Sequence, residues 1–253
     1  MSTLEGTVAL VTGASSGIGE ATARRLAADG AAVALVARRA DRLNALAKEL
    51  DGPGHRTLVI PADITEEAQA RAAVEQTVAE LGRLDTLVNN AGMMLLGPAV
   101  GAPIDEWQRM VEINVLGLLY CAHAGLPHLL AAATDGPRRV ADLVNVSSVA
   151  GRIARSGSGV YNLTKHGVGA LSESLRQEVT ARHVRVSLVE PGAVETELAG
   201  HNRPEIRDSI SRRFAEIERL QADDIADAVA YIVTRPRHVA VNELLIRPTE
   251  QEG

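Results

Sequence analysis

Seven short apolar runs alternate with longer helix-like segments along the chain, and this alternation strongly restricts the possible folds. The runs are rich in valine, leucine and isoleucine without strict polar alternation, which is typical of strands buried on both faces. They cover residues 8–11, 33–36, 58–60, 86–88, 140–146, 184–189 and 244–246. The helix-like segments cover residues 18–29, 41–50, 66–81, 104–133, 160–181 and 223–233. The pattern predicts an α/β fold, a doubly wound parallel sheet of seven strands with helices on both faces.

No proline- or serine-rich linker, internal repeat or low-complexity tract interrupts this alternation. We therefore expect one domain over residues 1–253. The segment at about 197–220 departs from the pattern, because it is polar and charged and contains no strand-like run. We expect it to form an insertion over the strand ends, with helical parts that act as a lid on a substrate site.

Composition excludes several classes of protein. The 253 residues are 46% hydrophobic and 23% charged, so wholesale disorder is not expected. The net charge of −6 and the lack of a basic tract argue against nucleic-acid binding. Cys121 is the single cysteine, so no intramolecular disulfide or thiolate metal site is expected, and its apolar neighbours predict a packed helix. No signal-peptide pattern or run of about 18 apolar residues is found, which predicts a cytoplasmic protein without membrane contact.

A glycine-rich turn follows the first predicted strand, at residues 12–19. Gly13, Gly17 and Gly19 allow tight backbone geometry and the close approach of an anion. The next helix offers its N-terminal amides and positive dipole end to a phosphate. No Gly-Lys-Ser/Thr follows, so a phosphate-cleaving loop is disfavoured. The pattern predicts a dinucleotide site, and an ordinary turn is the alternative.

The end of the second predicted strand indicates which dinucleotide is bound. NAD-preferring folds place Asp or Glu there, to bond the ribose hydroxyls. This chain has Ala37 followed by Arg38 and Arg39, which suit a 2′-phosphate through charge-assisted hydrogen bonds. We therefore expect NADP(H), and the alternative is that both arginines are simply solvated.

Tyr161 and Lys165 are the candidate catalytic pair. Their spacing of four residues places both side chains on one helix face. A nearby ammonium lowers the pKa of a phenol, which would make Tyr161 a proton donor and acceptor near neutral pH. Ser148, just past a strand end, would reach the same carbonyl oxygen. Most such Tyr/Lys pairs lie on a surface, so the case depends on the glycine turn in the same chain.

Five motifs in order resemble the short-chain dehydrogenase/reductase family over nearly the whole chain. They are TGASSGIG at 12–19, NNAG at 89–92, Asn114, Ser148 with YNLTK at 161–165, and PGAVET at 191–196. The resemblance implies a Rossmann-type fold and a homotetramer formed through the helices at 104–133 and 160–181, with a homodimer as the alternative. Residues 93–98, 128–130, 176–180 and 246–249 are similar to an NADP-dependent branch that includes clavulanic acid dehydrogenase.

The resemblance also implies roles for individual residues. Tyr161 is the general acid/base, Ser148 polarises the carbonyl with Ser147 as the less favoured choice, Lys165 bonds the nicotinamide ribose, and Asn114 holds a water in the proton relay. The implied cofactor contacts are Gly13, Ser15, Ser16, Gly17, Ile18, Gly19, Arg38, Arg39, Asp63, Ile64, Asn90, Ala91, Gly92, Tyr161, Lys165, Pro191, Gly192 and Thr196.

The sequence thus predicts an NADP(H)-dependent oxidoreductase that interconverts a carbonyl and an alcohol on a small polar substrate. Expected substrate-facing residues are Ser148, Met93, Met94, Ala150, Arg152, Arg155 and Gly192, and the two arginines would bind a substrate carboxylate unless they are merely solvated. One alternative is a catalytically silent NADP-binding regulatory or scaffold protein. Another is an epimerase or dehydratase of a related family.

Overall fold

The computed structural model describes residues 3–52 and 56–252, and its centre is one parallel sheet. The strand order is β3-β2-β1-β4-β5-β6-β7, and every pair of neighbours is parallel. The strands are β1 (Val8–Thr12), β2 (Ala32–Ala37), β3 (Thr57–Pro61), β4 (Thr86–Asn89), β5 (Ala141–Val146), β6 (Val184–Pro191) and β7 (Glu243–Ile246). The order reverses between β1 and β4, where doubly wound sheets bind ligands. The predicted fold class is confirmed.

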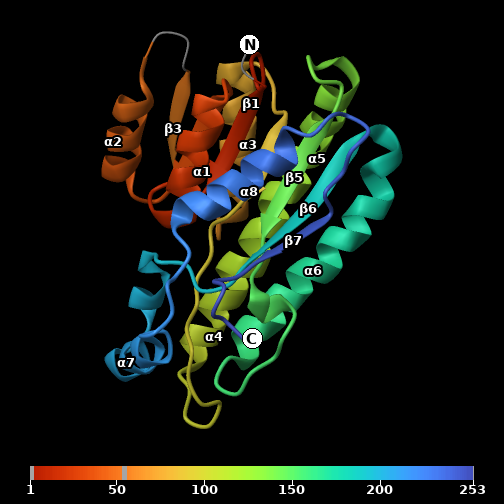
Figure 1. The fold of residues 1–253 in the computed structure, drawn as a ribbon. Coiled ribbons are helices and arrows are strands. Elements are labelled where there is room, and N and C mark those ends of the chain that lie inside the picture. Colours follow the sequence, from red (N-terminus) through yellow and green to blue (C-terminus); the bar gives the residue numbers. More distant parts are fainter. Residues whose placement is uncertain (1–2, 53–55, 253) are drawn as a thin grey trace.

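Helices cover both faces of the sheet (Figure 1). One core joins the sheet to α1 (Gly17–Ala28), α2 (Ala40–Leu50) and α8 (Ala222–Val233). The other joins it to α3 (Glu67–Leu81), α5 (Leu118–Asp135) and α6 (Gly159–Val179). Side chains alternate between the two cores along β1, with Leu10 in one and Val11 in the other. Both cores consist mainly of alanine, valine, leucine and isoleucine, as the 2% aromatic content requires.

The segment predicted as one helix at 104–133 is continuous but changes its pitch. It runs from α4 (Ile104–Val111) through a π-helical turn at Glu112–Gly117 into α5. The helix Ile104–Asp135 is long and apolar enough to cross a membrane by length and composition, contrary to the expectation from the sequence. Its buried residues, among them Cys121 and Leu129, belong to the core on one face of the sheet. It is packed as the core helix of a globular fold.

The segment after β6, for which the sequence analysis expected an insertion, is largely helical. A short 3₁₀ helix, η4 (Glu197–His201), precedes α7 (Pro204–Arg213), and Pro204 starts α7 where its missing N–H costs nothing. Figure 1 shows α7 set off from the sheet, at the lower left. The chain then returns to β6 through a bridge between Val194 and Leu220. Asn202 ties the insertion to the loop after β4, donating to the Met94 carbonyl at 2.9 Å.

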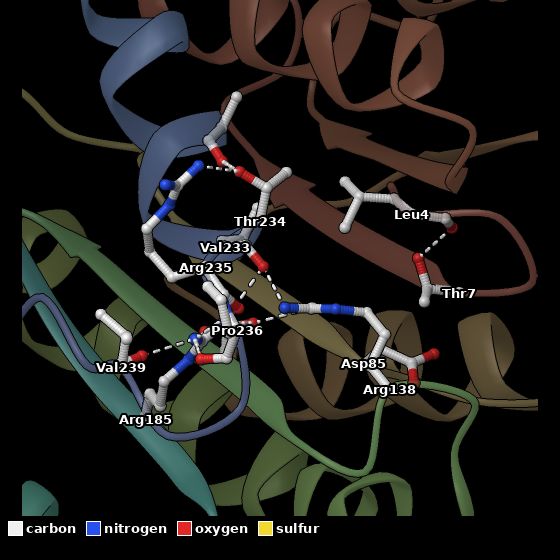
Figure 2. Close-up of polar contacts among 12 residues, drawn as sticks. Leu4, Thr7, Asp85, Arg138, Arg185, Val233, Thr234, Arg235, Pro236 and Val239 are labelled. Atoms are coloured by element: carbon white, nitrogen blue, oxygen red, sulfur yellow. Dashed lines mark hydrogen bonds and ion pairs between the residues drawn. The ribbon is translucent and has the colours of Figure 1, made fainter. Parts of the chain in front are cut away.

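A buried ion cluster lies at the amino edge of the sheet, where β5 and β6 begin. Arg185 donates to both carboxylate oxygens of Asp142, at 2.7 and 3.0 Å, and Asp142 is fully buried. The same guanidinium donates to the carbonyls of Val233 and Val239 at and beyond the end of α8 (Figure 2). Arg138 adds a second cation to Asp142 at 3.0 Å. The cluster anchors the C-terminus of α8 to the central strands.

Candidate functional site

A cavity of about 460 Å³ opens at the carboxyl edge of the sheet, beside the reversal between β1 and β4. Its walls come from the turn after β1, the ends of β2, β4, β5 and β6, the start of α6, and the insertion. The predicted residues that line it are Gly13, Ser15, Ser16, Gly17, Ile18, Arg38, Arg39, Asp63, Ile64, Asn90, Ala91, Gly92, Met93, Met94, Ser148, Ala150, Arg155, Tyr161, Lys165, Pro191, Gly192 and Thr196. Three others do not line it: Gly19, Asn114 and Arg152.

The turn between β1 and α1 is held against the end of β4. The Thr12 hydroxyl accepts the N–H groups of Asn90 and Ala91, at 3.0 and 3.1 Å, and the Asn90 amide donates to the Thr12 carbonyl at 3.0 Å. Gly13 has φ +68°, a left-handed conformation that side chains disfavour, and a Cβ there would lie 2.9 Å from the Ala91 Cα. These contacts bring the first turn of α1 to the cavity wall, with its N-terminal amides free for an anion.

Gly19→Ala is expected to lower the free energy of unfolding by about 1–3 kcal/mol. A Cβ at position 19 would collide with the Gly13 carbonyl oxygen and the Asn90 amide. Urea denaturation measures the loss. Gly167→Ala, at an exposed position of α6, is the matched control. A Cβ there meets nothing within 4 Å, so the substitution should stabilise the protein by about 0.4–1 kcal/mol. Equal stabilities for the two variants would contradict this packing.

Arg38 and Arg39 line the cavity where β2 ends. Arg39 donates to the Ser15 hydroxyl at 2.9 Å and to the Ser16 hydroxyl at 2.7 Å, and so joins the glycine turn to β2. It also pairs with Glu197 of the insertion at 2.9 Å. Hydrogen bonds from Arg39 and Arg42 lower the pKa of Glu197 to about 2. Arg38 is more exposed and lies 3.8 Å from Asp63. Cations and hydroxyl donors are thus gathered beside a helix N-terminus.

Ser148, Tyr161 and Lys165 meet on the opposite wall. The Ser148 hydroxyl accepts the Ala150 N–H at 3.1 Å, and the same side chain lowers the pKa of the Tyr161 phenol against the larger effect of burial. The Lys165 ammonium donates to the Val146 carbonyl at 2.9 Å and lies 5.9 Å from the centre of the Tyr161 ring. Ser147 is buried and donates to the Lys165 carbonyl at 3.1 Å, so its hydroxyl supports the helix. Ser148 rather than Ser147 is the serine that contacts Tyr161.

The pKa of Tyr161 is not lowered as the sequence analysis expected. Burial raises the pKa of the Tyr161 phenol, and the Ser148 side chain opposes this only in part. Burial also lowers the pKa of Lys165 to about 8, which weakens the cationic character that was expected to act on the phenol. Tyr161 is therefore protonated at neutral pH, which suits a proton donor.

Asn114 lies in the π-helical turn and is 2% exposed, outside the cavity lining. Its carboxamide accepts from the Met93 N–H at 2.8 Å and donates to the Met93 carbonyl at 2.8 Å. Its second N–H donates to the Thr164 hydroxyl at 3.2 Å. Both side-chain donors are used, so the side chain fixes the loop that carries Met93 between the two walls. Inserted turns of this kind often occur at functional sites.

Arg152 is not a substrate-facing residue, contrary to the sequence analysis. Its guanidinium donates to Glu190 at 2.6 and 2.8 Å and also pairs with Glu243. Glu190 is 1% exposed, and a buried carboxylate requires such a partner. Arg155 does line the cavity.

Several residues of the site were missed by sequence reasoning. Glu197, Arg213, Phe214 and Arg219 line the cavity from the insertion, which had been predicted only as a segment. Asn162, next to Tyr161, donates to the Ala150 and Ile153 carbonyls at 2.7 and 2.9 Å and positions the loop that carries Ser148. Its place within YNLTK was the available signal.

Comparisons with known proteins find a family and several oxidoreductases that are similar to this chain in sequence and fold. The model of the family described as short chain dehydrogenase matches residues 7–207. An uncharacterized oxidoreductase of Staphylococcus epidermidis is 36% identical over 241 residues, which cover 95% of this chain and 96% of the relative. An alcohol dehydrogenase of Thermococcus sibiricus, complexed with 5-hydroxy-NADP, has a TM-score of 0.86 at 30% identity and covers 98% of both chains. A serine dehydrogenase complexed with NADP⁺ has a TM-score of 0.86 at 32% identity, covering 98% of this chain and 97% of that one.

Proposed function

This chain belongs to the short-chain dehydrogenase family, and from that premise we propose that it is an NADP(H)-dependent oxidoreductase that interconverts a carbonyl group and an alcohol. The observation that carries the proposal is that Ser148, Tyr161 and Lys165 line the same cavity as the glycine turn. The proposal has two further parts. The substrate is small and polar, and the protein belongs to the branch of the family that resembles clavulanic acid dehydrogenase.

The residues present fit NADP(H). Gly13 and Gly17 line the cavity at the start of α1, where the helix N-terminal amides would bind the phosphates. Ser15, Ser16 and Arg39 offer donors at the end of β2, and no carboxylate occupies position 37, where an NAD-preferring fold would carry one. The two similar structures complexed with NADP⁺ or a hydroxylated NADP support the same choice.

The chain's own residues would handle the proton and the orientation of the substrate. NADPH supplies the hydride for the carbonyl carbon. The hydroxyls of Ser148 and Tyr161 bind the carbonyl oxygen, and the phenol gives that oxygen its proton, which completes the alcohol. In oxidation the phenolate accepts the alcohol proton. The Lys165 amine donates to the Val146 carbonyl and lies beside the Tyr161 ring. In its protonated form it stabilises the Tyr161 phenolate.

Removing both arginines at the end of β2 is expected to remove the preference for NADPH. In the variant Arg38→Ala with Arg39→Ala, the ratio of the NADH Kd to the NADPH Kd should fall about tenfold or more, because the 2′-phosphate loses charge-assisted hydrogen bonds. Fluorescence titration of both cofactors measures the ratio. Arg42→Ala, one turn farther and outside the cavity lining, is the control. An unchanged ratio would refute the role of the arginines.

The proposed activity is tested by following NADPH consumption over a panel of aldehydes and ketones. Turnover of at least one carbonyl compound to its alcohol is the expected result. Tight NADPH binding without turnover of any compound would favour the silent regulatory or scaffold alternative. Substrate conversion without net cofactor turnover would instead favour an epimerase or dehydratase.

A further inference from the structure

The charge of the cavity is opposite to that of the protein. The chain carries a net charge of −6, yet the cavity is lined by five arginines and Lys165 against two carboxylates, Asp63 and Glu197. Both carboxylates pair with arginines at the end of β2: Arg38 with Asp63 and Arg39 with Glu197. The compensated charges therefore lie where the 2′-phosphate is proposed to bind.

The three other arginines have no such partner. Arg155, Arg213 and Arg219 line the same cavity, and none of them forms an ion pair with a carboxylate among residues 3–52 and 56–252. Arg213 and Arg219 both lie against the Phe214 ring, 5.4 and 5.9 Å from its centre. A ring contact orients a guanidinium and leaves its N–H groups free to bind a ligand.

These arginines reach the cavity from two parts of the chain, the loop before α6 and the insertion. The backbone N–H of Arg155 donates to the side-chain oxygen of Asn162 at 3.2 Å, and Asn162 follows Tyr161 in the chain. Arg219 precedes Leu220, whose N–H donates to the Ala193 carbonyl at 3.0 Å, just past the end of β6. Arg213 ends α7. Apolar residues of the same lining, including Met94, Leu198 and Ile210, lower the local dielectric and strengthen attraction to an anion.

We propose, resting on the proposed function, that the substrate of this enzyme is an oxo acid or hydroxy acid, whose carboxylate is bound by Arg155, Arg213 and Arg219. Planar guanidinium groups match a carboxylate in bidentate geometry. The carboxylate would relieve the repulsion among uncompensated cations while Ser148 and Tyr161 hold the carbonyl at the other end. The insertion would thus contribute substrate specificity through its charge.

The test compares acids with their neutral esters. NADPH consumption is measured with succinic semialdehyde and its methyl ester, in the wild type, in Arg213→Gln with Arg219→Gln, and in Arg155→Gln. The ratio of kcat/KM for the acid to that for the ester should fall about tenfold or more in the variants. Arg212→Gln, exposed on α7 and outside the cavity lining, should keep the ratio. A wild-type enzyme that prefers the ester, or variants with an unchanged ratio, would overturn the proposal.

A binding measurement separates this proposal from the proposed function. Butanoate should bind the NADP⁺ complex more tightly than butanamide in calorimetry, and the double variant should lose that difference. Equal binding of acid and amide overturns the anion site whatever the turnover. A variant that instead loses NADP⁺ affinity assigns the arginines to the cofactor phosphates and also overturns it. Preferential butanoate binding without any carbonyl turnover upholds the anion site and defeats the proposed reaction.

Discussion

Tyr161→Phe is expected to slow carbonyl reduction by about 10² to 10⁴-fold while the NADPH Kd stays nearly unchanged. The substitution removes the hydroxyl that donates the proton and keeps the ring, which packs among Met93, Leu95 and Met110. Burial raises the pKa of the phenol, so the wild-type group holds its proton at neutral pH. Stopped-flow measurement of NADPH oxidation under single-turnover conditions measures the chemical step directly.

Tyr231→Phe is the matched control, because Tyr231 is 51% exposed on α8 and does not line the cavity. It should keep the wild-type rate. Ser148→Ala should slow the same step and leave cofactor binding intact, since Ser148 shares the carbonyl oxygen with Tyr161. If Tyr161→Phe turned over at the wild-type rate, the proton would have to come from another group and the catalytic assignment would fail.

The fold was largely predictable because periodicity reports burial. The apolar run at 184–189 forms most of β6, which continues for two further residues, Glu190 and Pro191. These two were not predicted, because a charged residue and a proline do not fit the pattern of a buried apolar strand. The π-helical turn at Glu112–Gly117 was not predictable, since hydrophobic spacing hardly distinguishes a single inserted residue within a long helix. Assembly as a homotetramer and a cytoplasmic location stay predictions, because contacts within one chain encode neither.

The site was predictable where its residues lie in short motifs, and less so where distant strands meet. Arg152 was assigned to the substrate because Glu190 and Glu243 are far from it in the sequence and come together only through the pairing of β6 with β7. The pairing of Glu197 with Arg39 likewise depends on the path of the insertion. The direction of the Tyr161 pKa shift depended on burial, which a motif does not report.

Arg185→Met is expected to lower the free energy of unfolding by about 3 kcal/mol, at the lower end of the cost of breaking a buried ion pair, because the fully buried Asp142 loses its bidentate partner and keeps only Arg138. The carbonyls of Val233 and Val239 would lose a donor as well, which loosens the end of α8 from β6. Urea denaturation at neutral pH measures the loss. A domain of ordinary stability has about 5–15 kcal/mol, so the loss removes a large part of the total.

The matched control is Arg207→Gln on α7, an exposed arginine whose loss should change stability by no more than about 0.5 kcal/mol. Asp142→Leu combined with Arg185→Met should be less unstable than the sum of the two single changes, because Asp142 and Arg185 are removed together; Arg138 then loses its carboxylate partner as it does in Asp142→Leu alone. The double variant should still fall below the wild type, since the Val239 carbonyl loses its Arg185 donor and the Val233 carbonyl keeps only Arg138. Additive losses would contradict a coupled ion pair at this edge, and would mean that Arg185 stabilises the fold through the α8 carbonyls alone.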